Sequence, residues 1–352
     1  MNLDDIILIN KLDQSNYYSE ILEFPTHLAE GWRIGQLNPL GFKGLEIDHV
    51  LICGMGGSAI GADLAASYAS YQSLTPIVIN REYDIPRWAK GERTLVITSS
   101  HSGNTEETIS CFKAALTRRC RILVLSTGGE LEKIAGSTGV SYWKFTHYGQ
   151  PRAAVGFSLG LILSAFAQLG FIEDLSVSIE NTINLLNNES SKFLVESPVQ
   201  KNPAKRLAGQ MVGRIPIIFG SDYLTPVVRR FKSQINELAK SWAQFEFLPE
   251  ADHNTAAGID YPETGGLGIF ALFLESITDH PRNRLRSHIT RQNFLIQGVN
   301  CDSYLVPGKN PLENICAGVQ FSDFVSFYLA IANNVDPTPI PGITAIKNSL
   351  SE

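Results

Sequence analysis

The stretch His49-Val-Leu-Ile-Cys-Gly-Met-Gly-Gly-Ser58 starts as an uninterrupted apolar run and ends in glycines and a serine. An apolar run of this length is typical of a parallel strand that is buried on both faces. A second run, Thr94–Ser99, continues into Ser-His-Ser-Gly-Asn-Thr105 and repeats the design. Each run leads into a predicted helix, over Ser58–Ser70 and Thr105–Leu116, so the two stretches belong to one strand–helix pattern.

This pattern fills the first half of the chain and starts again in the second. Alternating strands and helices with short loops are typical of a doubly wound parallel sheet. We therefore predict the α/β class, with two flavodoxin-like three-layer α/β/α domains and a C-terminal helical tail. The predicted strands are His49–Cys53, Thr75–Ile79, Thr94–Ser99, Arg121–Ser126, Val140–Phe145, Arg214–Ser221, Gly266–Glu275 and Ser303–Val306, and the predicted helices of the second half are Thr225–Ala243, Leu285–Gln297 and Leu312–Val335.

The same pattern predicts the domain organisation. We expect a helical lead-in, a first α/β domain, a helical bridge, a second α/β domain, and a C-terminal arm with a helix that packs back on the body. These parts are residues 1–45, 46–172, 173–205, 206–335 and 336–352.

Charge and composition limit the possible partners. A net charge of −6 argues against nucleic acid as the main partner. The five cysteines show no paired spacing, which favours free thiols and a cytoplasmic protein. The N-terminus is acidic where a signal peptide needs positive charge. The uncharged segment Ala153–Phe171 contains glycines, serines and a glutamine, so we predict a buried helix rather than a membrane span. The histidines lie too far apart in sequence to predict a metal site.

The two glycine- and serine-rich loops point to an anion. Hydroxyls and unpaired backbone N–H groups at a helix N-terminus favour negative charge, as does the helix dipole. Ser58, Ser100, Ser102 and Thr105 are therefore predicted phosphate ligands, and the alternative is that they cap the two helices. Two glycines beside them are expected to let the backbone approach the ligand, or else to form an ordinary turn; these are Gly56 and Gly57.

The chain resembles the SIS (sugar isomerase) fold and, more narrowly, the bifunctional phosphoglucose/phosphomannose isomerases. The resemblance rests on stretches that occur in the family's order between residues 50 and 350. They are Gly54-Met-Gly-Gly-Ser58, Ser100-His-Ser-Gly-Asn-Thr105, Pro151-Arg-Ala-Ala154, Asn236-Glu-Leu-Ala-Lys240, Leu248-Pro-Glu-Ala-Asp-His-Asn254 and Ile343–Leu350 around Lys347. It implies two SIS-type domains and an enzyme that interconverts glucose 6-phosphate and mannose 6-phosphate with fructose 6-phosphate, without a metal or a cofactor.

The resemblance also implies two groups for the proton transfer. Glu237 matches the base that moves a proton between C2 and C1, and Arg152 matches the cation that stabilises the enediolate. From the residues alone, a surface pair with Lys240 is the simpler interpretation of Glu237. For Arg152, the simpler interpretation is capping with a surface salt bridge.

Two further groups are implied for ring opening. His253 matches the residue that protonates the ring oxygen, and Lys347 matches a lysine that assists this step. In related isomerases the histidine reaches the site from the second subunit, which implies a homodimer. The alternatives are a loop histidine satisfied by its neighbours and a solvated lysine in the tail.

Two positions depart from the family's pattern. His101 stands where a tyrosine is usual, and Thr255 stands where an acidic residue is usual. Three other functions therefore stay open: a non-catalytic phosphosugar-binding regulator, an isomerase of another sugar phosphate, and a sugar-phosphate aminotransferase domain. The last normally needs an amidotransferase partner domain, which this sequence does not contain.

Overall fold

The computed structural model describes residues 2–259 and 268–350 and divides the chain into two compact units. One unit is Glu23–Asn184. The other combines Met1–Leu22 with Leu185–Glu352. The segment expected as a helical lead-in is therefore shared between the two units, and only its second part belongs with the sheet that follows it.

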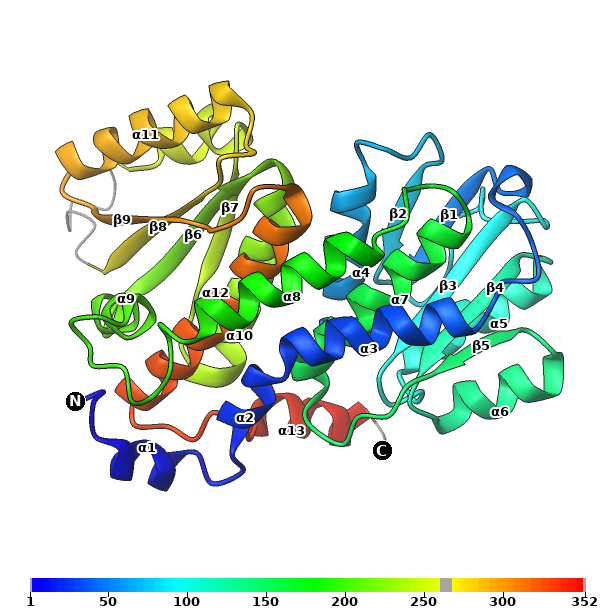
Figure 1. The fold of residues 1–352 in the computed structure, drawn as a ribbon, viewed down its shortest axis with the longest axis horizontal. Coiled ribbons are helices and arrows are strands. Elements are labelled where there is room, and N and C mark those ends of the chain that lie inside the picture. Colours follow the sequence, from blue (N-terminus) through cyan, green and yellow to red (C-terminus); the bar gives the residue numbers. More distant parts are fainter. Residues whose placement is uncertain (1, 260–267, 351–352) are drawn as a thin grey trace. The chain divides into compact units, whose positions relative to one another are not determined.

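The unit Glu23–Asn184 is built on a parallel sheet of five strands in the order β2-β1-β3-β4-β5 (Figure 1). The strands are β1 (His49–Cys53), β2 (Ile77–Asn80), β3 (Thr94–Ser100), β4 (Arg121–Ser126) and β5 (Ser141–Lys144). Every residue of β3 is buried, as its continuous apolar run predicts. All five strands expected in the first half are confirmed, two with the predicted ends and three with ends shifted by one or two residues.

Helices cover both faces of this sheet. The helices α5 (Glu106–Thr117) and α6 (Gly129–Thr138) form a hydrophobic core with one face, and α4 (Gly56–Ala69) packs with α7 (Val155–Gln168) and α3 (Phe24–Leu37) on the other. Twelve of the fourteen residues of α7 are buried, which confirms the prediction of a buried helix over the uncharged segment.

The second unit is built on a four-stranded parallel sheet in the order β7-β6-β8-β9. The strands are β6 (Ile215–Ser221), β7 (Gln244–Leu248), β8 (Ile269–Glu275) and β9 (Asn300–Leu305), and the helices are α1 (Ile6–Leu12), α2 (Tyr17–Leu22), α9 (Pro203–Met211), α10 (Thr225–Ala239), α11 (Pro281–Ile296), α12 (Pro311–Ala332) and α13 (Pro341–Leu350). The strand order repeats that of β2-β1-β3-β4, so the two-copy pattern seen in the sequence is confirmed.

Three details differ from the sequence-based expectations. The helix expected over Thr225–Ala243 ends at Ala239, because Lys240 takes a left-handed conformation, and the strand β7 follows where none was predicted. The segment 173–205, expected as a helical bridge, contains the helix α8 (Ser176–Ser190) and only the first residues of α9, so it is helical in part. The strand predicted from Gly266 begins at Ile269, and its residues 266 and 267 lie outside the described residues.

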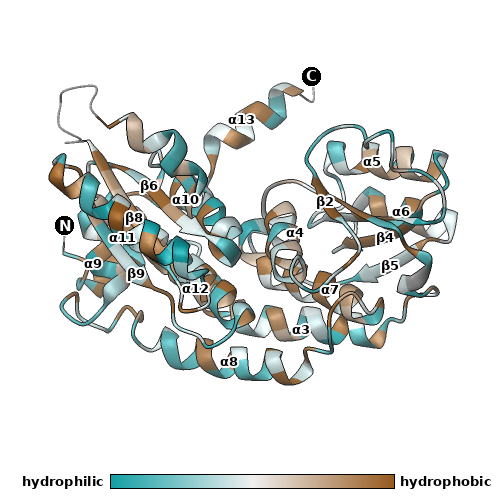
Figure 2. Ribbon diagram, turned by 90° about the horizontal axis from the view of Figure 1, so that it is seen from above, coloured by the Kyte–Doolittle hydropathy of each residue, from teal (hydrophilic) through white to brown (hydrophobic). Residues whose placement is uncertain are grey.

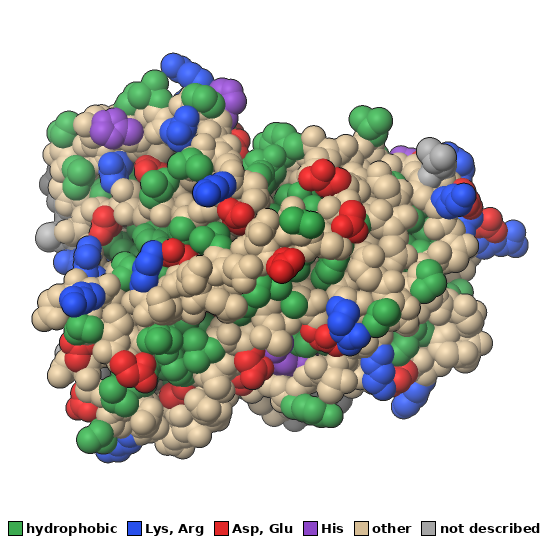
Figure 3. Space-filling view, viewed as in Figure 1, with side chains coloured by type: hydrophobic (Ala, Val, Ile, Leu, Met, Phe, Trp, Pro, Cys, Tyr) green, Lys and Arg blue, Asp and Glu red, His purple; other side chains and the backbone are tan. Residues whose placement is uncertain are grey.

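Within the described residues one helix, α12, is long and apolar enough to cross a membrane, and 94% of that stretch is buried in the protein. Figure 3 shows charged side chains of both signs scattered over the face in view, without a single basic patch.

Candidate active site

The carboxyl ends of β1 and β3 lie side by side in the first sheet. The two strands pair in parallel, with Cys53 opposite Thr98. The loop after β1 leads into α4 at Gly56, and the loop after β3 leads into α5 at Glu106. Two helix N-termini therefore start from one edge of the sheet, where ligands of open α/β sheets commonly bind.

The loop after β3 folds back on itself through its hydroxyls. Ser100 Oγ lies 2.8 Å from Thr105 Oγ1 and accepts a hydrogen bond from the Gly103 N–H at 3.1 Å. Ser102 Oγ accepts from the Asn104 N–H at 3.2 Å, and its side chain is exposed. The structure thus places Ser100 next to Thr105 and leaves the Ser102 hydroxyl within reach of a ligand.

The capping alternative describes neither helix. Met55, not a serine, occupies the N-cap position of α4, and Ser58 is buried inside the first turn. Thr105 occupies the N-cap position of α5, but its hydroxyl faces Ser100, and no side-chain cap is formed at either helix among the described residues. The N–H groups of both first turns are therefore not taken up by a side-chain cap, and an anion can accept from them.

A close backbone contact brings Arg152 to the start of α4. A Cβ added to Gly57 would lie 2.9 Å from the Pro151 carbonyl oxygen and 3.3 Å from the Arg152 Cα, so only glycine allows the approach. Arg152 lies in the 3-10 helix η2 (Pro151–Ala154) with 4% exposure, and its Nη1 donates to Gln150 Oε1 at 3.3 Å. This arginine is buried rather than solvated at the surface.

Glu237 lies in the last turn of α10, in the second unit, and is half-buried. The Lys240 ammonium donates to the backbone carbonyl oxygens of Glu237 at 2.7 Å, Leu238 at 3.1 Å and Pro337 at 3.2 Å. Through these hydrogen bonds Lys240 caps the C-terminal end of α10 and holds the C-terminal arm.

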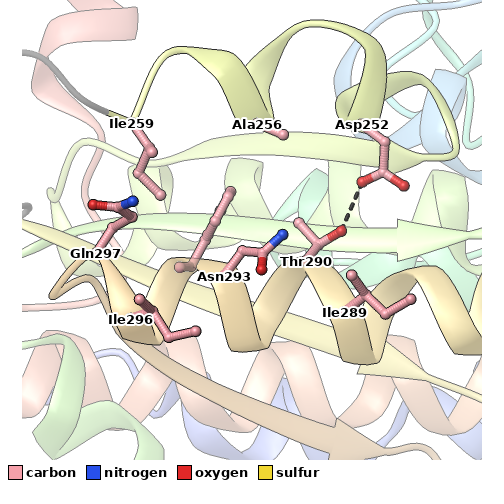
Figure 4. A pocket seen from close by; sticks show the side chains of 9 residues that line it. Asp252, Ala256, Ile259, Ile289, Thr290, Asn293, Ile296 and Gln297 are labelled. Atoms are coloured by element: carbon pink, nitrogen blue, oxygen red, sulfur yellow. Dashed lines mark hydrogen bonds between the residues drawn. The ribbon is translucent and has the colours of Figure 1, made fainter.

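His253 ends the short 3-10 helix η4 (Glu250–His253), and its side chain is exposed. Its neighbour Asp252 fixes this segment on α11, because its carboxylate accepts from Arg286 Nη1 at 2.8 Å and from Thr290 Oγ1 at 2.7 Å. Figure 4 shows Asp252 and Thr290 at one end of a pocket between this segment and α11. The pocket measures about 340 Å³ and is lined mainly by apolar side chains, and His253 is not among them.

Lys347 lies on α13, whose ten residues are all exposed. Figure 2 shows this helix projecting, with hydrophobic and hydrophilic residues alternating along it. The expectation that the apolar tail packs back on the body is therefore wrong for this structure. Ile343, Ile346 and Leu350 form an apolar side of α13, and Leu350 is 70% exposed.

Three histidines that the sequence did not bring together meet at the loop after β3, which we call the phosphate loop (residues 100–105) after its predicted role. His101 Nε2 lies 2.9 Å from His147 Nδ1, and the His27 ring contacts the His147 ring edge-on at 5.0 Å between centroids. Burial lowers the pKa of His101 and His27, and it lowers the pKa of His147 to about 4 with further lowering by the two neighbouring rings. The signal available in the sequence was that His147 follows β5, whose carboxyl end lies at the same edge of the sheet as that of β3.

Within residues 2–259 and 268–350, no group of three or more His, Cys, Asp or Glu side chains is arranged to hold a metal ion.

The cysteines are all free, as expected from their spacing; they are Cys53, Cys111, Cys120, Cys301 and Cys316. Thr255, the second position that departs from the family pattern, donates through its N–H and its hydroxyl to Asn254 Oδ1.

The fold defines an α/β protein built on two parallel sheets, with a candidate anion site at the carboxyl ends of the strands of the first sheet. Comparison with known proteins identifies its family. Residues 200–350 match the bacterial phospho-glucose isomerase C-terminal SIS domain. A bifunctional phosphoglucose/phosphomannose isomerase of Caldicellulosiruptor bescii is 36% identical over 95% of this chain and 99% of its own length. The corresponding isomerase of Aquifex aeolicus is 32% identical over 86% of this chain and 90% of its own length.

The chain belongs to the bifunctional phosphoglucose/phosphomannose isomerase family. A solved structure of a glucose-6-phosphate isomerase like protein from Thermus thermophilus shares the fold, with a TM-score of 0.64 and 18% identity over 97% of this chain and 98% of that chain. The two sheets are those of two SIS-type domains, and the predicted fold class is confirmed.

Proposed function

We propose that this protein is an aldose–ketose isomerase that interconverts glucose 6-phosphate and mannose 6-phosphate with fructose 6-phosphate. The observation that carries the proposal is the edge of the first sheet. There two helices begin without a side-chain cap, the hydroxyls of the phosphate loop lie beside them, and Gly57 brings the backbone of Arg152 against the first turn. The named relatives supply the reaction class.

Phosphate binding uses the first turns of α4 and α5. Their N–H groups and dipoles favour a dianion, and Ser58, Ser100, Ser102 and Thr105 supply hydroxyl donors. Charge-assisted hydrogen bonds of this kind are roughly twice as strong as neutral ones. Because the donors are hydroxyls and backbone groups, the site binds the phosphate and leaves the sugar carbons free to react.

Proton transfer uses Glu237 and Arg152. The Glu237 carboxylate takes the proton from C2 of the open-chain aldose and returns it to C1, while O2 loses a proton and O1 gains one. The Arg152 guanidinium stabilises the negative charge that develops on the enediolate oxygens, and such a fixed donor is commonly worth about 3 kcal/mol of the barrier. The enediolate is the same from either configuration at C2, so the glucose and mannose compounds share one intermediate.

Ring opening uses His253 and Lys347. Protonation of the ring oxygen must accompany cleavage of the C1–O5 bond, and an imidazole is suited to this transfer near neutral pH. His253 is exposed on its own chain, and the side of α13 that carries Ile346 and Leu350 is also exposed. These features support a homodimer in which His253 serves the site of the partner subunit. The free thiols support a cytoplasmic location.

The competing functions make different demands on the same residues. A phosphosugar-binding regulator needs the phosphate loop but has no use for Glu237, His253, Arg152 and Lys347 together. An isomerase of another sugar phosphate keeps all of them and differs in the groups around the sugar, for which His101 and Thr255 are the positions to examine.

A coupled assay of fructose 6-phosphate formation tests the proposal, with glucose 6-phosphate and mannose 6-phosphate as separate substrates. We expect turnover of both by the unmodified protein and a loss of about a thousandfold in Glu237→Gln, since a general base contributes about 10²–10⁴ to a rate. Glu180→Gln, which removes an exposed carboxylate from α8, serves as the matched control and keeps full activity. A folded protein that turns over neither substrate contradicts the proposal.

Mixing two inactive variants tests the shared site. If His253 acts across a dimer interface, subunits carrying Glu237→Gln and subunits carrying His253→Ala form mixed dimers with one intact site. Random mixing then restores about one quarter of the activity, because half of the dimers are mixed and each has one working site. A mixture that stays inactive although its subunits exchange, measured by mass spectrometry, places both residues in the site of one chain.

A further inference from the structure

The phosphate loop is held in place at His101, which lies between the proposed phosphate ligands Ser100 and Ser102. The His101 carbonyl oxygen accepts hydrogen bonds from the Thr127 N–H at 3.1 Å and from Thr127 Oγ1 at 2.7 Å. The His101 ring is held separately, with Nε2 2.9 Å from His147 Nδ1. Residue 101 is therefore fixed through its backbone on one side and through its side chain on the other.

His147 is itself held by packed rings. It contacts His27 edge-on at 5.0 Å and Phe157 at 5.9 Å between ring centroids, and Phe157 stacks on His27 at 4.6 Å. Because these rings come from α3 and α7, His147 cannot turn away from His101 without disturbing the helix layer.

The same cluster reaches the segment that carries the arginine. His27 Nδ1 lies 3.4 Å from the carbonyl oxygen of Ala153, the residue after Arg152, and His27 Nε2 lies 3.2 Å from Glu23 Oε2. A continuous set of contacts thus runs from the phosphate loop through His101, His147 and His27 to η2.

We propose that His147 is a positioning residue that holds the phosphate loop, through His101, in register with the segment that carries Arg152. The proposal rests on the proposed function and deepens it. The phosphate fixes the substrate at the loop, and the arginine must meet the oxygens at C1 and C2, so the loop and η2 need a set spacing. In this proposal His147 acts through His101 rather than on the substrate itself.

The protonation of the pair suits this role. Two facing imidazole nitrogens form a hydrogen bond only when one of them carries a proton and the other does not. If both facing nitrogens carry a proton, the rings repel each other. Burial lowers the pKa of both rings, and the pKa of His147 falls to about 4, so the pair is neutral at neutral pH. Glu23 is the carboxylate that faces the cluster, at His27. The hydrogen bond between the two rings is therefore present at neutral pH.

Steady-state kinetics with two variants of His147 test this role. His147→Phe keeps a ring in the pocket and removes the hydrogen bond, and we expect kcat/KM for glucose 6-phosphate to fall about three- to tenfold, the range of one hydrogen bond. His147→Asn places an amide close to the position of Nδ1, and we expect it to restore kcat/KM to within about twofold. Equal losses in both variants overturn the proposal.

A double-variant cycle tests whether His147 acts through His101. If it does, His101→Phe combined with His147→Phe lowers kcat/KM no more than His147→Phe alone, whereas independent roles give multiplied effects and overturn the proposal. Thermal unfolding of each variant confirms that it is folded.

Calorimetric binding of glucose 6-phosphate separates failure of this proposal from failure of the proposed function. A protein that binds but does not turn over contradicts the isomerase function, and the affinities of the variants still decide the role of His147. A protein that neither binds nor turns over the substrate contradicts both.

Discussion

In the first sheet, α4 and α5 begin without a side-chain cap within the described chain, whereas in the second sheet α11, which follows β8, begins with the His280 ring accepting from the Arg282 N–H at 3.2 Å. The two edges have the same strand order. They differ in what their side chains do with the free N–H groups. At the first edge these N–H groups are available to a ligand. At the second edge those of α11 are taken up by side chains, whereas α10 begins without a side-chain cap in the described chain.

Carboxylates take the place of an external anion at the second edge. Asp222, directly after β6, accepts from the His280 N–H at 2.8 Å and from Asn283 Nδ2 at 3.1 and 3.2 Å. Asp279 accepts from the Ser276 N–H at 2.7 Å and is 4% exposed. The topology therefore supplies two places suited to an anion, and the residue types decide which one stays open to a ligand.

Converting the first edge into the second is the strongest test of this comparison. Thr105→Asp places a carboxylate at the N-cap of α5, where it caps the helix and repels the phosphate. We expect kcat/KM for glucose 6-phosphate to fall about a thousandfold, since like charges cost several kcal/mol. We expect the free protein to gain about 1 kcal/mol in its free energy of unfolding from the new cap. Enzyme kinetics and chemical denaturation measure the two effects.

Thr105→Asn is the matched control, because it supplies a cap of similar size without the charge. It is expected to gain the same stability and to lose far less activity than Thr105→Asp. If both variants lose activity equally, the charge is not the cause, and the contrast between the two edges does not explain where the phosphate binds.

The second edge predicts a dependence of stability on pH. Burial raises the pKa of Asp279 from 3.8 to about 7, with Asp222 and Glu275 adding to the rise. The folded state holds this proton more tightly than the unfolded state, so stability is highest below about pH 4 for this group and falls as the pH rises to about 7. The loss amounts to at most about 4 kcal/mol at pH 8.

Asp279→Asn removes this titration while keeping an oxygen that accepts from Ser276. We expect the variant to be more stable than the unmodified protein at pH 8, and the difference to shrink at pH 5. Denaturation curves at both pH values provide the measurement, and activity serves as the control, since the residue lies outside the proposed site. A difference that does not change with pH contradicts the ionisation of Asp279 as its source.

The sequence predicted the sheets well because their strands are local apolar runs, but it placed the end of α10 too late. Residues 240–243 contain neither glycine nor proline, so no residue type there signals the helix end. Two contacts with distant segments hold this end: Asn333 Nδ2 donates to the Ala239 oxygen at 3.1 Å, and the Lys240 ammonium donates to the Pro337 oxygen at 3.2 Å. The strand β7 was missed with it, although its counterpart β2 in the first half pointed to a strand there.

The site divides in the same way. The hydroxyls near the helix N-termini follow from the order of residues along the loops, so the sequence could name Ser100 and Thr105. The contact between the His101 and His147 rings joins positions 46 residues apart across the sheet edge, and no local sequence pattern predicts it. The sequence predicted that Gly57 lets the backbone approach the ligand, whereas the structure shows that the close neighbour of Gly57 is the Pro151 carbonyl.

A comparison of two glycines gives the last test of the two edges. Gly57→Ala puts a methyl group 2.9 Å from the Pro151 carbonyl oxygen, which is backbone and cannot turn aside, so the segment with Arg152 must move. A displacement near the reacting atoms costs up to about a hundredfold in rate, and we expect kcat to fall about ten- to a hundredfold.

Gly220→Ala is the control at the end of β6, where the methyl group meets Val228 Cγ1 at 2.7 Å. Its cost is expected in stability, about 1–3 kcal/mol, with kcat unchanged. Measured side by side by kinetics and denaturation, an equal loss of kcat in both variants would show that the first edge has no special tie to Arg152. A loss confined to Gly57→Ala instead locates the chemistry where the backbone of Arg152 meets the first turn of α4.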